Sequence, residues 1–284
     1  IQVPTTFVLA CYLKNIKTIS AQNRSITAVW GNQLIFDHYF ISGPMFKEIY
    51  KQRRHAIGEY HTIGLPRSSN IKVSNLGHQY NRFLDIKNKY TLSICFDVQP
   101  ISYFQEGLYN EIYSKKCIIE FYQAILKLSI DFPSTYFVIK PKSIDIFKDQ
   151  FFDEIKTEID AIRNIEIIAD LKKFNPYSMA SLADIIIGKH TSILEEAFAA
   201  GKKVIFFDSE KFIQSTDYVF NEINVIEDTY EGLRRRIIDI TENDEYIDQH
   251  EWDLFNKKYF FNRNDKDGFQ LIKEKVSKIY QVMN

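Results

Sequence analysis

The chain has 284 residues, of which 45% are hydrophobic and 26% are charged. This composition supplies enough apolar surface for a buried core and excludes a disordered, collagen-like or low-complexity chain. The length favours two lobes of roughly 100 to 200 residues each. With 36 basic and 37 acidic residues the net charge is -1, so no global positive field draws the chain onto nucleic acid. We therefore expect a globular protein with local basic sites and no nucleic-acid partner.

The cysteine and histidine patterns argue against a disulfide framework and a metal site. The three cysteines, Cys11, Cys95 and Cys117, are far apart and form no C-x-x-C pair. The six histidines show no H-x-H or H-x-x-x-H spacing. No apolar run approaches the roughly 20 residues of a membrane-spanning helix, and the first residues lack the order of a secretion signal. We expect a cytoplasmic protein without metal. Because the sequence starts at Ile1 inside a strand-like segment, we also expect that upstream residues of the first lobe are missing.

The first part of the chain predicts three strands and one helix. The strands are expected at Phe7–Tyr12, Thr18–Ala21 and His38–Ile41, and the helix at Pro44–Arg53. A turn-rich and then polar stretch follows, which places a lobe boundary at about residues 65–88.

From Tyr90 onward, short β-branched runs alternate with longer helical patterns, which is typical of βαβ units around a parallel sheet. The expected strands are Tyr90–Asp97, Tyr136–Lys140, Ile165–Ala169, Asp184–Gly188, Lys203–Phe207 and Val225–Ile226. The expected helices are Ser114–Leu128, Ile144–Ile162, Pro176–Leu182, Ser192–Ala200, Thr229–Asp239, Asn243–Phe255 and Gly268–Met283. Asn175 is expected to cap one helix and Gly201 to end another. The fold class is therefore α/β with parallel sheets.

A strand, a polar turn and a helix follow one another around Gly188, and this segment carries the clearest chemical signal. The helix that begins near Ser192 directs its free amides and positive dipole end out of the carboxyl edge of the sheet, which favours anion binding. Thr191 and Ser192 add hydroxyl donors, and Glu195 or Glu196 can accept hydrogen bonds from sugar hydroxyls. Alternatively, Thr191 or Ser192 is only a helix cap and Glu195 its capping-box partner. The residues alone leave both readings open.

Four stretches resemble bacterial GT-B glycosyltransferases that build surface polysaccharides. The segment from Ala183 to Ile205 resembles the donor-binding pattern ADxxIG-x-x-(S/T)(S/T)-x-x-x-E-A-x-x-x-G-K-x-V-I. Phe137–Lys142 is similar to the "KPHP" element, with Lys142 in place of its histidine. His38–Gly43 and His61–Arg67 resemble the passage that ends the N-terminal lobe. Lys17–Asn23 resembles "K-T-I-x-x-Q-H-G".

The resemblance implies a GT-B-like fold of two Rossmann-type lobes with an incomplete N-terminal lobe. Residues 1–70 would end the acceptor-side lobe, 71–260 would form the nucleotide-sugar-binding lobe, and 261–284 would be a helix that packs back on the first lobe. The implied function is metal-independent glycosyl transfer in polysaccharide biosynthesis, of the capsule or lipopolysaccharide type. The donor would be of the CMP-Kdo, CDP-polyol or UDP-sugar type, the acceptor a glycan or a lipid-linked glycan, and no cofactor beyond the nucleotide-sugar co-substrate is expected.

Site residues follow from the same resemblance. The donor would be bound by basic side chains, the turn before the helix and the first turns of the helix: Lys140, Lys142, Gly188, His190, Thr191, Ser192, Glu195 and Glu196. The two glutamates would accept hydrogen bonds from sugar hydroxyls of the donor, and the other residues would face its phosphates. By position, a general base or nucleophile would be Asp97, at the carboxyl end of the first strand of the C-terminal lobe, or Glu106 or Glu111 in the loop after it. The acceptor side would contain Gln22 and Asn23. The alternatives are that the two lysines end a solvated strand, that His190 is structural, and that Asp97 is a turn or cap residue.

Three arginines in a row, Arg234 to Arg236, lie on a predicted helix. They are either a solvated helix face or a patch for peripheral association with the inner membrane face, where lipid-linked acceptors lie. Two other functions stay open: a nucleotide-sugar 2-epimerase, which needs carboxylates on both faces of the sugar, and a non-catalytic GT-B module that binds nucleotide sugar.

Overall fold

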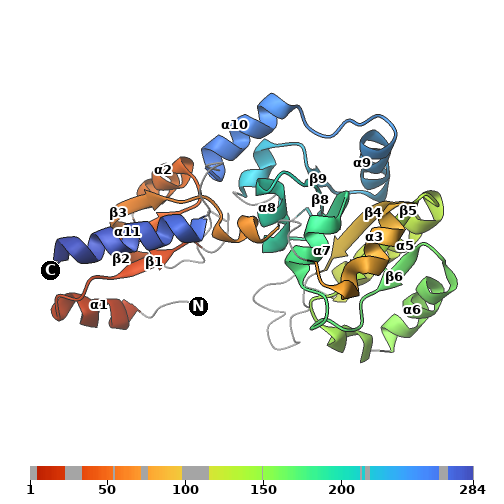
Figure 1. Ribbon diagram of the computed structural model, residues 1–284, viewed down its shortest axis with the longest axis horizontal. Coiled ribbons are helices and arrows are strands. Elements are labelled where there is room, and N and C mark those ends of the chain that lie inside the picture. The colour runs from red at the N-terminus through yellow and green to blue at the C-terminus, as the bar shows by residue number, and fades with distance from the viewer. Residues whose placement is uncertain are drawn as a thin grey trace. The chain divides into compact units, whose positions relative to one another are not determined.

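The computed structural model of the chain describes residues 5–22, 34–53, 55–71, 76–97, 115–148, 150–211, 213–214, 218–261 and 268–283 (Figure 1). The chain forms two compact units. Unit 1 consists of Ile1–Ser69, Thr216–Glu222 and Asp248–Asn284, and unit 2 of Asn70–Ser215 and Ile223–Ile247.

The elements of unit 1 are α1 (Thr5–Leu13), β1 (Ile19–Ala21), β2 (Ile35–Ile41), α2 (Pro44–Gln52), β3 (Ala56–Thr62), η1 (Pro66–Asn70), η4 (Val219–Glu222), α10 (Gln249–Tyr259) and α11 (Gly268–Met283). The elements of unit 2 are η2 (His78–Tyr80), α3 (Asn81–Lys87), β4 (Thr91–Phe96), α5 (Lys115–Asp131), β5 (Thr135–Lys140), η3 (Ile144–Lys148), α6 (Phe151–Ala161), β6 (Ile165–Ile167), α7 (Pro176–Leu182), β7 (Ile185–Gly188), α8 (Ser192–Ala199), β8 (Lys203–Phe207), β9 (Ile226–Glu227) and α9 (Tyr230–Thr241).

Unit 1 contains a three-stranded parallel sheet of order β1-β2-β3. Helix α11 packs on this sheet, because its Leu271 forms a buried cluster with Phe40 of β2 and with Ile63, which directly follows β3. Gly43, just before α2, has no room for a side chain, since a Cβ there would lie 2.2 Å from the backbone of Tyr259 in α10. These contacts join the N-terminal strands to the two C-terminal helices of the unit.

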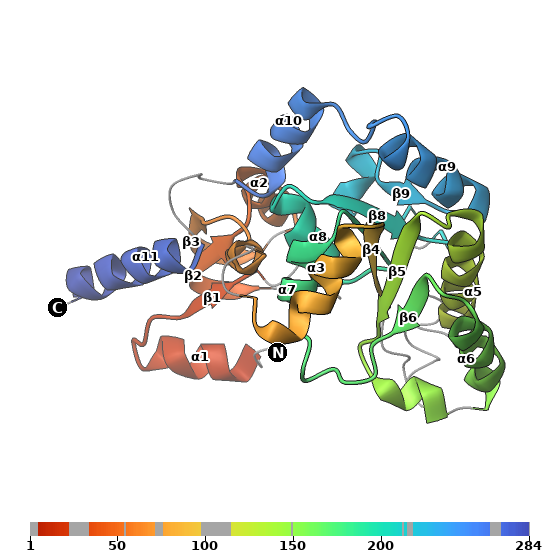
Figure 2. The same ribbon diagram turned by 45° about the vertical axis from the view of Figure 1, so that its right-hand side comes forward.

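Unit 2 is a three-layer α/β structure around a six-stranded parallel sheet of order β6-β5-β4-β7-β8-β9. Helices α5, α6 and α9 cover one face, which we call the α5 face, and share its apolar core. Helices α3, α7 and α8 cover the other face, the α8 face (Figure 2). The predicted α/β class with parallel sheets is confirmed.

Most elements of unit 2 were predicted within two or three residues, including the caps. Asn175 accepts a hydrogen bond from the Tyr177 amide at 2.8 Å and so caps α7. Gly201 ends α8 with a positive φ of 82°, a conformation that favours glycine. The predicted helix Ile144–Ile162 is divided into η3 and α6.

Four predictions were wrong or incomplete. The predicted strand Phe7–Tyr12 is helix α1, because periodicity does not distinguish a short apolar strand from a short apolar helix. Strand β3 and helix α3 were missed. Helix α10 begins at Gln249 rather than at residue 243, because the Asp248 carboxylate accepts from the amides of His250 and Glu251 and caps the helix there. The C-terminal lobe was predicted to end at residue 260, whereas Asp248–Asn284 lies in unit 1.

Candidate functional site

Three residues at the carboxyl edge of the large sheet form one row on the α8 face. Phe96, the last residue of β4, is the register partner of Lys140 in β5 and of Gly188 in β7. Register partners on neighbouring parallel strands point to the same face, and strands lie about 4.8 Å apart. A Cβ on Gly188 would approach Leu194 of α8, so this row faces α8. Lys140 and Gly188 are thus about 10 Å apart across the edge.

Gly188 allows the close packing of this edge. A Cβ at this position would lie 2.7 Å from the carbonyl oxygen of Phe96 and 2.8 Å from a methyl group of Leu194. The glycine therefore lets β4 and the first turn of α8 approach β7 closely, and this packing fixes where α8 begins.

Helix α8 begins without a side-chain cap. Thr191 is its N-cap residue in extended conformation, and its hydroxyl makes no capping hydrogen bond. The capping-box alternative is therefore not supported. Thr191 and Ser192 are half-buried, whereas His190, Glu195 and Glu196 are buried. The amino end of α8 thus presents its free amides together with two partly exposed hydroxyl groups.

Lys140 is the buried cation of this row. Only 7% of the residue is exposed, and burial lowers its pKa, against the attraction of the Asp97 charge. Within the described part of the chain its ammonium group has no hydrogen-bond or ion-pair partner. Lys142, two residues later and after Pro141, is exposed. A lysine with a buried stem and an ammonium group that has no partner of its own can place its charge beside a bound anion.

Asp97 follows β4 and lies on the opposite, α5 side of the edge. Its carboxylate accepts hydrogen bonds from the Lys142 amide at 2.6 Å and from the Tyr122 hydroxyl of α5 at 2.9 Å. Burial raises the pKa of Asp97 to about 7, although these two donors and the charges of Lys140 and Lys142 act in the other direction. Asp97 therefore ties the end of β4 to the turn that carries the two lysines.

Lys189 also lies on the α5 side and is committed to an internal ion pair. Its ammonium group lies 2.7 and 2.8 Å from the two carboxylate oxygens of Glu210, and it donates to the Cys117 sulfur at 2.7 Å. Burial acts to raise the pKa of Glu210, but the neighbouring Lys189 charge contributes to a net lowering. Ser209 donates to Glu210 at 2.7 Å. This cluster joins the ends of β7 and β8 to α5.

The remaining predicted residues lie elsewhere. Gln22 follows β1 in unit 1, and its side-chain oxygen accepts from the Ser42 amide at 2.9 Å, which holds the ends of β1 and β2 together. Asn23 and Glu106 lie outside the described residues. Arg236 of the arginine run is buried and pairs with Glu227 at 2.9 Å. It is therefore part of neither a membrane-binding patch nor a solvated helix face.

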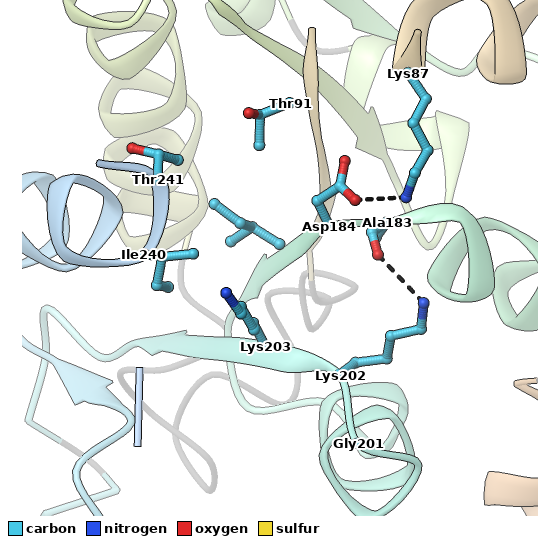
Figure 3. A pocket seen from close by; sticks show the side chains of 10 residues that line it. Lys87, Thr91, Ala183, Asp184, Gly201, Lys202, Lys203, Ile240 and Thr241 are labelled. Carbon is cyan, nitrogen blue, oxygen red and sulfur yellow. Dashed lines mark hydrogen bonds and ion pairs between the residues drawn. The ribbon is translucent and has the colours of Figure 1, made fainter. Parts of the chain in front are cut away.

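A pocket of about 400 Å³ lies at the opposite, amino edge of the large sheet. Its lining residues are Lys87, Thr91, Ala183, Asp184, Ile185, Gly201, Lys202, Lys203, Ile240 and Thr241. The lysines are engaged: Lys87 bonds to Asp184, and Lys202 donates to the backbone carbonyl oxygen of Ala183 (Figure 3). Lys202 also donates to the carbonyl oxygen of Ser181, and Lys203 pairs with Asp244. Ligands of open α/β sheets bind at the carboxyl ends of the strands, so this pocket is not our candidate site.

Sequence reasoning missed the buried partners on the α5 face, Tyr122 and Glu210, because helix and loop residues give no spacing signal for contacts to a strand end. It also missed a cluster in unit 1 of His38, Glu59 and His61, which come from two neighbouring strands. In the described residues, no helix combines the length and apolarity needed to cross a membrane.

Comparisons with solved structures show the same fold. The S. aureus MnaA–UDP co-structure is 9% identical with a TM-score of 0.63, and the alignment covers 97% of this chain and 71% of that one. The UDP-GlcNAc 2-epimerase from Neisseria meningitidis bound to UDP-GlcNAc is 15% identical with a TM-score of 0.61, at 96% and 72% coverage. A wall teichoic acid polymerase TagF structure soaked with CDPG is 12% identical with a TM-score of 0.51, at 88% and 59%. The chain spans only part of the length of each.

These neighbours have the GT-B fold, and this chain shares it. No curated protein sequence matches the chain. The family model of the polysaccharide biosynthesis PFTS motif proteins matches residues 21–236, which is well over half of the chain. The chain therefore belongs to the polysaccharide biosynthesis PFTS motif family.

Proposed function

We propose that the protein is a metal-independent glycosyltransferase that uses a nucleotide-activated sugar in bacterial surface polysaccharide synthesis. The observation that carries the proposal is Lys140, a largely buried lysine whose ammonium group has no hydrogen-bond or ion-pair partner among the described residues, on the same face of the sheet as the amino end of α8. Family membership and the nucleotide-bound neighbours support it.

We call the two lysines Lys140 and Lys142, together with the amino end of α8, the phosphate cradle. This cradle would bind the donor diphosphate or phosphodiester along the carboxyl edge of the large sheet. Lys140 and Lys142 would approach it from β5, and the free amides of α8 with the hydroxyls of Thr191 and Ser192 would approach from β7. The distance of about 10 Å between the two sides suits the phosphate and sugar parts of a nucleotide sugar. His190 is buried, and Lys189 forms an ion pair with Glu210. We therefore propose no direct contact of either residue with the phosphates.

Glycosyl transfer breaks the bond between the anomeric carbon and the leaving phosphate oxygen, which keeps the electron pair. Negative charge grows on that phosphate, and the lysine side chain with the helix amides stabilises it more in the transition state than in the ground state. The acceptor oxygen forms the new bond to the anomeric carbon, and its proton passes to a general base. For this role we keep Glu106 as the candidate and assign Asp97 to positioning, because both of its carboxylate oxygens already accept hydrogen bonds within the chain.

A second candidate function is epimerisation of a nucleotide sugar. It is raised by the UDP-GlcNAc 2-epimerase from Neisseria meningitidis bound to UDP-GlcNAc, which shares this fold. The phosphate cradle would be the same in both functions. The two differ in the product: a transferase releases the free nucleotide, whereas an epimerase converts one intact nucleotide sugar into another.

A thermal-shift panel with CMP, CDP, UDP and GDP tests the proposal. A nucleotide at 100 times its Kd stabilises the native state by about 2.7 kcal/mol, which raises the Tm by about 5 °C or more for a chain of this size. We expect one nucleotide to give this shift in the wild type and in Lys156→Met, an exposed control on α6. Lys140→Met and Ser192→Ala should lose most of it.

Product analysis with the matching nucleotide sugars then separates the functions. Release of free nucleotide that depends on an added glycan acceptor supports transfer, and interconversion of two intact nucleotide sugars supports epimerisation. A thermal shift without turnover would point to a binding module. If no nucleotide stabilises the wild type at millimolar concentration, the cradle itself is wrong.

A further inference from the structure

Two histidines and a glutamate come together on the small sheet of unit 1. His38 lies on β2, and Glu59 and His61 lie on β3. His38 is the register partner of Glu59, and Phe40 is the partner of His61. Because residues two apart on a strand point to the same face, all three side chains project from one side of the sheet.

The polar atoms of these side chains converge on one point. His38 Nδ1 lies 3.2 Å from His61 Nε2 and 3.4 Å from a carboxylate oxygen of Glu59. The three donor atoms all lie within 4.8 Å of one another. The His61 ring packs on Phe40, with ring centroids 5.1 Å apart, and is 5% exposed. The Glu59 side chain is 61% exposed. The cluster thus has a buried base and an open side.

These separations fit a tetrahedral metal ion. Zinc binds histidine nitrogen at about 2.0–2.1 Å and carboxylate oxygen at about 2.0–2.2 Å, so two such ligands at a tetrahedral angle are about 3.3–3.5 Å apart. The observed 3.2 and 3.4 Å from His38 Nδ1 match this range. The third pair, His61 Nε2 and Glu59, lies within 4.8 Å, and the exposed Glu59 side chain can close that distance by a change of rotamer. Three protein ligands leave one position for water on the exposed side.

We propose that His38, Glu59 and His61 form a binding site for a divalent transition-metal ion of the zinc type. Two imidazole nitrogens and one carboxylate select zinc, nickel, cobalt or copper over magnesium and calcium, which prefer oxygen ligands only. The ion would link strand β2, through His38, to strand β3, through Glu59 and His61. Lys275 of α11 is close enough to exert a repulsive charge effect on His61, and it would weaken binding of the cation. The inference is independent of the nucleotide site in unit 2.

Zinc binding to tag-free protein, measured by competition with a chromophoric chelator, tests the site. We expect one zinc ion per chain in the wild type and a loss of affinity of at least about 100-fold in His38→Ala and Glu59→Gln, since loss of even an outer-shell partner costs 10- to 100-fold. Glu59 is exposed, so Glu59→Gln retains the fold. The exposed His250→Ala is the matched control, and Lys275→Gln should tighten binding.

The absorption spectrum of the cobalt-loaded protein gives a second readout, because tetrahedral cobalt absorbs strongly in the visible range and hydrated cobalt does not. Zinc should also raise the Tm of the wild type and not that of Glu59→Gln. The proposal is overturned if the wild type binds no zinc below about 10 µM free ion. It is equally overturned if His38→Ala and Glu59→Gln bind zinc as tightly as the wild type, which would assign the ion to other ligands such as the cysteines.

Discussion

Replacement of Lys140 by methionine separates a binding role from a structural one. Methionine has similar length and no charge, so it fills the space of the lysine side chain without its ammonium group. Lys140 is 7% exposed and has no hydrogen-bond or ion-pair partner among the described residues. If its ammonium group is kept for a ligand phosphate, the variant loses affinity for the nucleotide and does not lose stability.

The expected sizes follow from the surroundings of the side chain. A hydrogen bond to a charged group contributes about 1.5–3 kcal/mol, so the Kd for the nucleotide should rise about 10- to 150-fold. Partial desolvation of the charged ammonium group lowers stability, and attraction to Asp97 offsets part of this cost. Burial raises the pKa of Asp97 to about 7, so Asp97 is mostly neutral at pH 6 and does not attract the Lys140 charge there. The gain in unfolding free energy from Lys140→Met should therefore be larger at pH 6 than at pH 8.

The assays are urea unfolding at the two pH values and isothermal titration with the nucleotide that stabilises the wild type. Lys156→Met on α6 is the control for a lysine-to-methionine change at an exposed site. The reasoning is refuted if Lys140→Met is less stable than the wild type and binds the nucleotide with unchanged affinity. That result would make Lys140 a structural partner of Asp97.

Three further predictions concern the same sheet edge. Burial raises the pKa of Asp97 from 3.8 to about 7, so between these pH values the native state retains a proton that the unfolded state releases. The unfolding free energy of the wild type should therefore fall from pH 4 to pH 7 relative to that of Asp97→Asn, by at most about 4 kcal/mol in urea unfolding. Gly188→Ala should lower stability by about 1–3 kcal/mol, whereas Gly77→Ala, which meets only the flexible end of a glutamine side chain, should cost less; equal costs would contradict the packing argument. Lys189→Met should cost about 3–5 kcal/mol because it leaves Glu210 buried and unpaired, and a double-mutant cycle with Glu210→Gln should recover much of it; additive costs would show that the pair is not coupled.

Much of the fold could be predicted from the sequence because unit 2 uses strong local signals. Buried β-branched strands end at glycine or proline, and an Asn-Pro pair starts α7. Where such signals are weak, prediction failed: the apolar segment of α1 has no clear period, and β3 (Ala56–Thr62) has a half-polar sequence, AIGEYHT, that reads as a loop.

The candidate site could be predicted only in part. The anion-binding geometry before α8 depends on the order strand, turn and helix, which is a local pattern. Which face each side chain takes depends on strand register: Lys140 and Gly188 share one face, and Asp97 and Lys189 lie on the other. The His38–Glu59–His61 cluster joins residues of two strands, so a search for spacing within one element could not find it.

Amide hydrogen exchange with and without saturating nucleotide tests the central claim most directly, because it locates the ligand on the sheet. We predict slower exchange in peptides that cover residues 189–194 and 140–142, where the free amides of α8 and the turn after β5 would meet the phosphates. Unchanged exchange in both peptides at saturation would contradict the account. Protection confined to the amino edge, around Thr91, Lys202 and Ile240, would contradict it as well.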